Sequence, residues 1–230
     1  MRLKNIKIIA VIPARSGSET IKNKNIILYK GRPLIYHSIK LALNSKMIDR
    51  VIVSTDSKKY AKLSTKLGAE VPFLRPTKIS QNNSNDSGWI FHALNYLIKK
   101  EKYYPDLIIH LRPTSPNREL KTFEKGIKWF LKNKKISTSM RSVSIFSQPP
   151  QKLFKIKEKF LKGFFDEKYS GEYHSKPRQY YPITYLPNGY IDILKTSHIL
   201  KTKKIYGNKI LPYITDPVLD IDSKQDLKLG

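Results

Sequence analysis

Two groups of residues, one near each end of the chain, carry side chains suited to phosphate chemistry. In the segment 13–25, P-A-R-S-G-S-E-T-I-K-N-K-N, positive charge comes from Arg15, Lys22 and Lys24, and Gly17 lies between two serines. Directly after a strand, such small residues let backbone N–H groups point at an anion. The segment matches neither G-x-x-x-x-G-K-[ST] nor G-x-G-x-x-G. Taken alone, it predicts either a phosphate-binding loop or a solvated turn.

The second group is the pair Asp220 and Asp222, which are separated by Ile221. In an extended segment successive side chains point to opposite sides, so both carboxylates would share one side while Ile221 faces the core. Mg²⁺ prefers oxygen ligands and commonly links protein carboxylates to substrate phosphates. Because so short a pattern recurs by chance, a metal site and a helix-capping or solvated pair both remain open.

The elements that would position these groups follow an α/β pattern. Apolar runs typical of buried parallel strands end in polar residues at 6–12, 50–54 and 107–111. Helical patterns follow these runs at 33–44, 58–67 and 87–100. This alternation predicts right-handed crossovers and a doubly wound, mostly parallel sheet. Ligands of such sheets bind at the carboxyl ends of the strands, where the polar residues fall.

Beyond about Met140 the pattern becomes irregular. Prolines interrupt a stretch rich in Tyr, Phe and Lys, and no long helical pattern is evident. We therefore expect irregular strands and hairpins inserted into the sheet domain. A strand pattern returns near 190–194, and a short helix is expected after Asp222. A chain of 230 residues is long enough for one large domain or two small ones.

Charge and composition narrow the classes of protein. The chain has 44 Lys and Arg against 18 Asp and Glu, a formal net charge of +26 that would attract phosphates, nucleic acid or an anionic membrane surface. The basic residues are dispersed and no nucleic-acid-binding motif is recognised, so nucleic-acid binding is the less favoured alternative. A hydrophobic content of 40% without a long uncharged run argues against a membrane-spanning or largely disordered chain.

The residues that are missing also matter. Without cysteine the chain has neither disulfides nor cysteine-ligated zinc, and nothing favours an oxidising compartment. The first apolar run is too short for a signal-peptide core. We therefore expect a cytoplasmic protein. The five histidines show no metal-ligand spacing and receive no role.

The motifs form an ordered set along the chain. They are P-A-R at 13–15 with Lys24-Asn25, V-S-T-D at 53–56, L-R-P at 74–76, L-R-P-T-S-P at 111–116, Arg178-Gln179, Asn188-Gly189 and D-I-D at 220–222. Their order and spacing resemble those of the acylneuraminate cytidylyltransferases, also called CMP-sialic acid synthetases. Relatives in that family act on legionaminic, pseudaminic and other nonulosonic 2-keto acids. The resemblance implies a Rossmann-like nucleotidyltransferase fold, one domain over residues 1–230, with an inserted dimerisation element at about 140–190.

The resemblance also implies a reaction and residue roles. The sugar's anomeric 2-hydroxyl would attack the α-phosphorus of CTP in line and release pyrophosphate, in a homodimer that requires Mg²⁺ or Mn²⁺. Lys152 could instead be a solvated charge, Arg178 a structural ion-pair partner and Asn188 part of an ordinary turn. The implied roles are catalysis for Arg15, Lys24 and Asp222; nucleotide binding for Arg15, Ser18, Lys24, Asn25 and Arg75; binding of the acidic sugar for Arg112, Lys152, Arg178, Gln179 and Asn188; and metal binding for Asp220 and Asp222.

The sequence departs from the family pattern in the first loop. Where the family commonly has R-G-G-S-K-G, this chain has R-S-G-S-E-T at 15–20. Glu19 in place of lysine changes the local charge by two units, and a screened repulsion at ~4 to 6 Å from a triphosphate costs on the order of 1 to 3 kcal/mol. Thr20 in place of glycine disfavours positive φ. A nucleotide- or sugar-binding protein of the same fold with weakened catalysis is therefore the alternative function.

Two further departures concern the sugar. Arg112 stands where many members of the family have Gln, and Leu186 stands where some sialic-acid-specific members have Arg. Because the two positions lie in different loops, the cation gained at Arg112 need not replace the cation lost at Leu186. We therefore expect a nonulosonic acid other than N-acetylneuraminic acid, or a related acidic sugar, as the substrate.

Overall fold

The computed structural model describes residues 6–228 and contains a central six-stranded sheet with the strand order β10-β6-β9-β5-β1-β4. Strand β9 runs antiparallel to both of its neighbours, and the remaining neighbours pair in parallel. The mostly parallel sheet expected from the sequence is thus confirmed. The strands are β1 (Ile8–Pro13), β4 (Arg50–Ser54), β5 (Leu107–His110), β6 (Ser139–Phe146), β9 (Thr184–Lys195) and β10 (Ile210–Ile214).

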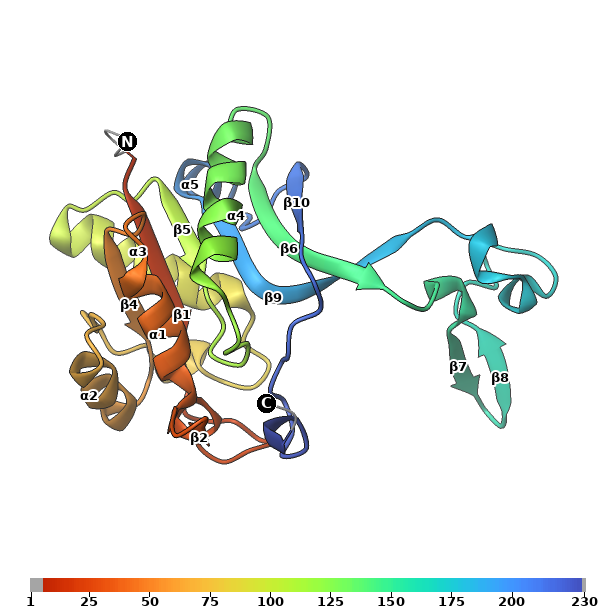
Figure 1. The fold of residues 1–230 in the computed structure, drawn as a ribbon, viewed down its shortest axis with the longest axis horizontal. Helices are drawn as coiled ribbons and strands as arrows, with labels where there is room; N and C mark the ends of the chain where they lie inside the picture. The colour runs from red at the N-terminus through yellow and green to blue at the C-terminus, as the bar shows by residue number, and fades with distance from the viewer. Residues whose placement is uncertain (1–5, 229–230) are drawn as a thin grey trace.

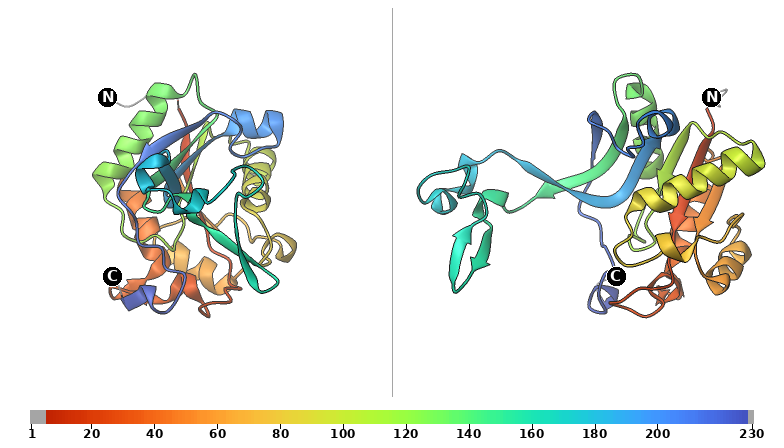
Figure 2. Two further views of the ribbon diagram at one scale, coloured as in Figure 1. Left: turned by 90° about the vertical axis from the view of Figure 1, so that its right-hand side faces the viewer. Right: turned by 180° about the vertical axis from the view of Figure 1, so that it is seen from behind.

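Helices cover both faces of this sheet (Figures 1 and 2). One face packs against α1, α2 and α4, and the other packs against α3 and α5. Because both faces are covered, β1 is apolar at nearly every position instead of alternating. Within residues 6–228, no helix has the length and hydropathy needed to cross a membrane. The helices are α1 (Leu34–Asn44), α2 (Lys58–Lys66), α3 (Asp86–Glu101), α4 (Leu120–Asn133) and α5 (Thr196–Thr202).

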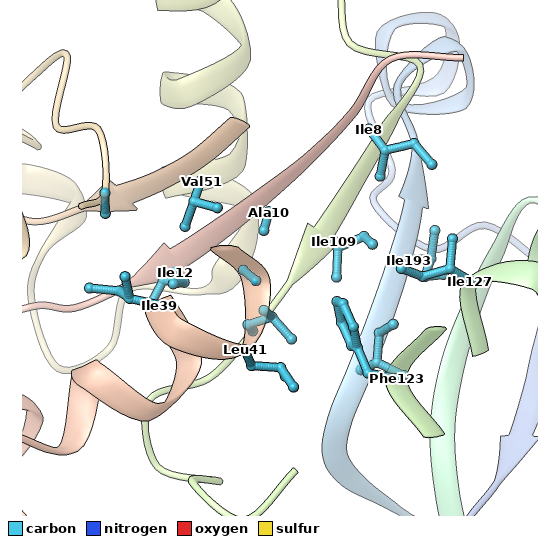
Figure 3. Close-up of a cluster of buried hydrophobic side chains, with 14 of the residues drawn as sticks. Ile8, Ala10, Ile12, Ile39, Leu41, Val51, Ile109, Phe123, Ile127 and Ile193 are labelled. Atoms are coloured by element: carbon cyan, nitrogen blue, oxygen red, sulfur yellow. The ribbon is translucent and has the colours of Figure 1, made fainter. Parts of the chain in front are cut away.

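The core of the first face shows how strand and helix spacing combine. Ala10 and Ile12 of β1 point to this face, two residues apart, as the strand period requires. They meet Ile39 of α1, and the same cluster continues to Phe123 and Ile127 of α4 (Figure 3). The opposite side chains of β1 join the second cluster, under α3. The packing fixes the carboxyl end of β1, from which the first loop leaves.

Short elements connect these layers. A two-stranded pair, β2 (Leu28–Tyr29) with β3 (Arg32–Pro33), follows the first loop. The terminal helix expected after Asp222 is a single 3₁₀ turn. The 3₁₀ helices are η1 (Lys24–Ile26), η2 (Thr77–Ile79), η3 (Pro150–Lys152), η4 (Tyr173–Ser175), η5 (Arg178–Tyr180) and η6 (Asp226–Lys228).

An arm projects from the sheet between β6 and β9 (Figure 1). The two strands continue beyond the body of the sheet as a ribbon, in which Val143 pairs with Pro187 and Phe146 with Thr184. Its far end carries the hairpin of β7 (Phe154–Lys157) and β8 (Phe160–Gly163) together with η4 and η5. The arm lies inside the segment 140–190, where irregular strands and hairpins are expected. Its part in dimerisation stays a prediction.

Candidate active site

A cavity of about 610 Å³ opens at the carboxyl ends of β1 and β5, the edge of the sheet at which the polar residues were expected. The first loop, the 75–86 segment, the segment after β5 and the C-terminal segment all contribute to its wall. The lining residues on which the site depends are Arg15, Ser18, Glu19, Lys24, Asn25, Arg75, Asp86, His110, Arg112 and Asp222. All five predicted nucleotide-binding residues therefore line one cavity.

The first loop is held by side-chain contacts at both ends. Asp56, which follows β4, accepts hydrogen bonds from the backbone N–H of Ser16 at 2.8 Å and from its hydroxyl at 2.9 Å. At the other end, the buried Asn25 donates its amide to the backbone carbonyl of Arg15 at 2.9 Å. These contacts orient Arg15 and Ser18 toward the cavity. Asn25 thus has a structural task in addition to its predicted role beside the nucleotide.

The first loop and the C-terminal segment meet at this cavity. Lys24 Nζ lies 2.7 Å from Asp222 Oδ1, although the residues are 198 positions apart. The contact is supported by Ile221, which is fully buried beside Tyr29 and Leu34, and whose N–H donates to the carbonyl of Thr114 at 2.8 Å. Ile221 faces the core, as predicted. Figure 1 shows the C-terminal segment beside the region of β2.

The carboxylate of Asp222 is open to ligands. Its side chain is 71% exposed, and Lys24 approaches only its Oδ1. The backbone of the segment is fixed by Asp226, which accepts from the N–H groups of Asp222 and Ser223 at 3.0 and 2.7 Å. Asp220, by contrast, is not among the described residues that line the cavity.

Arg75 is buried, yet its charge is not matched by a direct ion pair. Its Nε and Nη2 atoms have no hydrogen-bond partner within residues 6–228, while its backbone N–H donates to Thr55 at 2.7 Å. Burial lowers the pKa of this guanidinium, and Arg15 lowers it further against the opposing effect of Asp56. Since buried polar groups are normally paired, the open donors at the cavity wall indicate a ligand with acceptor oxygens.

Glu19 is accommodated by a neighbour that the sequence analysis does not single out. Asn82 donates its amide to Glu19 and accepts a hydrogen bond from Arg15, so it links the acid to the cation. Thr20 does not have a positive φ. The left-handed residue of this loop is Asn23, with φ 58°, and asparagine tolerates that conformation. The expected backbone strain at Thr20 is thus absent.

Four predicted sugar-binding residues lie outside the main cavity. Lys152, Arg178 and Gln179 belong to the arm, where the latter two line a separate cavity of about 390 Å³. Asn188 sits in β9 and donates to the hydroxyl of Thr215 at 2.7 Å. None of them lines the main cavity within the part of the chain that is described. Among the described residues, Arg112 is the one predicted sugar-binding residue that lines the main cavity.

The sequence reasoning also missed Asp86 and Asp192, which pair with Arg112. Arg112 Nη1 lies 3.1 Å from Asp192 Oδ2, and Arg112 Nη2 lies 3.5 Å from Asp86 Oδ2. Burial opposes the charge of Arg112, but the two carboxylates together raise its pKa. The available signal was the position of Asp86 at the start of a helical pattern and of Asp192 inside an otherwise apolar strand, where a lone acid requires a partner.

Comparisons with known proteins bear on the family and the fold. A family model described as Cytidylyltransferase matches residues 9–149. The chain is 34% identical over 226 residues to the N-acylneuraminate cytidylyltransferase of Escherichia coli O18:K1:H7 (strain RS218 / NMEC). That match covers 97% of this chain and 51% of the relative, so the chain spans about half the length of that protein.

A second relative is matched over nearly its whole length. The chain is 31% identical over 232 residues to the CMP-N,N'-diacetyllegionaminic acid synthase of Legionella pneumophila subsp. pneumophila (strain Philadelphia 1), with 97% of this chain and 94% of the relative covered. Among solved structures, CMP:2-keto-3-deoxy-manno-octonic acid synthetase complexed with CTP superposes with a TM-score of 0.68 at 15% identity, covering 97% and 96% of the two chains. The latter likeness concerns the fold. From the family model and these two relatives, the chain belongs to the cytidylyltransferase family of nucleotidyltransferases.

Proposed function

We propose that the protein transfers CMP from CTP to the anomeric hydroxyl of a nonulosonic, sialic-acid-like 2-keto sugar acid and releases pyrophosphate. The observation that carries this proposal is the meeting of Lys24 and Asp222 at a cavity that Arg15 and Arg75 also line. The relatives named above act, by their names, on two such sugars, and the solved neighbour is complexed with CTP. The absence of cysteine fits a cytoplasmic reaction.

The nucleotide would lie along the wall formed by the first loop and Arg75. Arg15 and Lys24 supply two cations for the triphosphate, where negative charge accumulates on the departing pyrophosphate. Ser18 would add its hydroxyl at the same wall, because its backbone N–H already donates to the carbonyl of Ser16. The unpartnered N–H groups of Arg75 suit the oxygens of the ribose and the base.

The donor set also fits a hard divalent cation, Mg²⁺ or Mn²⁺. Among residues 6–228 no three carboxylate or imidazole groups converge in a preformed metal cluster, so oxygens of the triphosphate would complete the ligand sphere beside Asp222. When bound, the ion neutralises phosphate charge and favours ionisation of the attacking hydroxyl. Asp220, outside the cavity wall, would act at longer range. Lys24 Nζ contacts Asp222 Oδ1 and so keeps this carboxylate at the cavity wall.

The acceptor would occupy the end of the cavity formed by Arg112, whose cation suits the carboxylate of a sugar acid. The arm residues Lys152, Arg178 and Gln179 would come from a second copy of the chain. The arm exposes several apolar side chains, including Ile183 and Leu186. They support such a homodimer because exposed apolar patches usually mark sites of contact with another protein. In this arrangement Asn188 steadies the base of the arm.

A pyrophosphate-release assay tests the proposal. It crosses the four ribonucleoside triphosphates with a panel of nonulosonic acids, with and without Mg²⁺. We expect release with CTP, with at least one acid of the panel, and only when the metal is present. The absence of release with every acid at saturating CTP would remove the proposed function.

Glu19 favours one alternative, a nucleotide- or sugar-binding protein of the same fold with weak catalysis. The acid lines the cavity that we assign to the triphosphate. Tight CTP binding without turnover would support that alternative. We do not expect a nucleic-acid partner, and a gel shift that survives ~200 mM salt would contradict this.

A further inference from the structure

A row of polar side chains crosses the sheet next to the cavity. In the strand register His110 of β5 stands opposite Asp192 of β9, and Asp192 stands opposite Arg141 of β6. Directly opposite residues of antiparallel strands project to the same face, here the face covered by Trp89 and Tyr206. Asp192 is wholly buried in the middle of this row. A buried carboxylate in such a position has to be compensated by its neighbours.

The neighbours of Asp192 fall into two groups, one for each oxygen. Oδ2 takes Arg112 Nη1 at 3.1 Å and the hydroxyl of Tyr206 at 2.9 Å. Oδ1 faces Arg141 Nε at 3.4 Å, and Arg141 stacks on the ring of Tyr206 at 4.5 Å from its centre. Of these three partners only Arg112 lines the main cavity in the described part of the chain. His110 lines it too, but its Nδ1 lies 3.9 Å from Oδ2 and makes no hydrogen bond to Asp192. The carboxylate therefore connects one cavity cation to groups outside the cavity.

The backbone of Arg112 is fixed separately from its side chain. Its carbonyl accepts from Ser38 Oγ at 3.1 Å and from Arg118 Nη2 at 2.9 Å. Arg118 is itself partly buried and also donates to the carbonyls of Gly189 and Tyr190. Among residues 6–228, Asp192 is the one fully buried group to which the Arg112 guanidinium donates a hydrogen bond. The second carboxylate, Asp86, is partly exposed and 3.5 Å away.

We propose that Asp192 is a positioning residue that holds Arg112 with its free N–H groups toward the cavity, so that they bind the carboxylate of the acceptor sugar. This inference rests on the proposed function and adds to it the group that sets the acceptor end of the site. In this proposal the acceptor carboxylate would bind Arg112 on the side where Asp86, which also lines the cavity, lies 3.5 Å from Nη2. Asp192 touches no substrate atom itself.

The test compares Michaelis constants in two backgrounds. Asp192→Asn removes the charge and keeps the shape, and we expect the KM for the sugar acid to rise about 10- to 100-fold, as for the loss of a charge-assisted hydrogen bond. The KM for CTP should change less than about twofold. In the background Arg112→Gln, the same Asp192→Asn change should leave the sugar KM unaltered. A general structural role for Asp192 would give equal losses in both backgrounds, and that result would overturn the inference.

Two further variants keep the test decisive. Arg141→Gln removes a guanidinium that faces the same carboxylate from outside the cavity. The KM for the sugar acid should therefore stay within about twofold of its unaltered value. A rise as large as that of Asp192→Asn would count against the inference. If Asp192→Asn does not fold, Tyr206→Phe loosens the same Oδ2 without changing charge. It should raise the sugar KM severalfold, and only while Arg112 is present; an unchanged KM there would refute positioning.

The outcome separates this inference from the proposed function. If the unaltered protein releases pyrophosphate but the Asp192→Asn variant keeps its sugar KM, the inference fails and the function stands. If the unaltered protein releases none with any acid, both fail.

Discussion

Lys24 Nζ lies 2.7 Å from Asp222 Oδ1 at the mouth of the cavity, and this ion pair joins the first loop to the C-terminal segment. With Asp222 largely exposed, such a pair contributes at most about 1 kcal/mol to folding. Its position is therefore better explained by what the two groups bind together. In the proposed function, these two charges would bind the triphosphate and its cation.

Replacing Asp222 tests this relationship first. Asp222→Asn should lower kcat about 100- to 1,000-fold, the range for the loss of one group that stabilises transition-state charge. The free energy of unfolding should change by less than about 0.5 kcal/mol, because the side chain is exposed. Asp220→Asn is the matched comparison, with a loss at least about tenfold smaller. Equal losses in kcat would show that both carboxylates hold the metal.

Replacing Glu19 tests the alternative function. Because Asn82 joins Glu19 to Arg15, the acid is already compensated, and Glu19→Lys should change kcat by less than about threefold. Glu19→Gln serves as the neutral control. A rise in kcat of more than about tenfold in steady-state assays would instead mean that Glu19 suppresses turnover.

The conformation of Gly189 makes a prediction about stability. Its φ is +70°, and a Cβ there would stand 2.9 Å from the hydroxyl of Ser115 and 3.6 Å from Cδ of Arg112. Gly189→Ala should therefore lower the free energy of unfolding by roughly 1 to 3 kcal/mol in urea titrations. Gly17→Ala, where no atom lies within 4 Å and φ is not positive, should stay within about 0.5 kcal/mol. Equal effects would contradict the described backbone conformation of Gly189.

His110 predicts a pH dependence of stability. Burial lowers its pKa to about 4, with Arg112 acting in the same direction and Asp86 opposing. The unfolded chain then binds a proton below about pH 6.5 that the folded protein binds only near pH 4. The unfolding free energy should thus fall by about 3 kcal/mol as the pH drops through this window. His110→Gln should remove that part of the slope in denaturant titrations at several pH values; an unchanged slope would exclude His110 as its source.

The arm predicts an oligomeric state. Ile183 on the arm and Ile136 beyond α4 are 68% and 67% exposed in the single chain, so they form a matched pair. If the arm packs against a second copy, Ile183→Lys should weaken the dimer at least about tenfold in sedimentation experiments, while Ile136→Lys leaves it unchanged. Loss of activity together with the dimer would support contributions from Lys152, Arg178 and Gln179 across the interface. A monomeric unaltered protein would contradict the homodimer.

Much of the fold could be predicted from apolar runs and helical spacing. The strand at 50–54 and the helices α1 to α3 agree with the sequence analysis within about one or two residues at each end. Helix α4 was missed although Phe123, Ile127 and Phe130 follow helical spacing. Strand β10 contains Pro212, which argues against a strand and is tolerated here because β10 lies at the edge of the sheet. Helix α5 has only 7 residues, too few for periodicity to decide.

The site was predictable where it depends on local motifs and not where it depends on register. Arg15, Lys24 and Asp222 stand in recognisable segments, and the structure brings them to one cavity. The pairing of Arg112 with Asp192 joins residues 80 positions apart and follows from the register of β5 and β9, which a single sequence does not reveal.

The fate of the phosphorus atoms of CTP tests the central claim most directly. The unaltered protein is given Mg²⁺, a nonulosonic acid and CTP labelled at either the α- or the γ-phosphorus, and the products are separated. We predict that the α-label appears in the sugar nucleotide and the γ-label only in pyrophosphate, in equal amounts. Transfer of the γ-label to the sugar, its release as inorganic phosphate, or no transfer with any acid would contradict cytidylyl transfer.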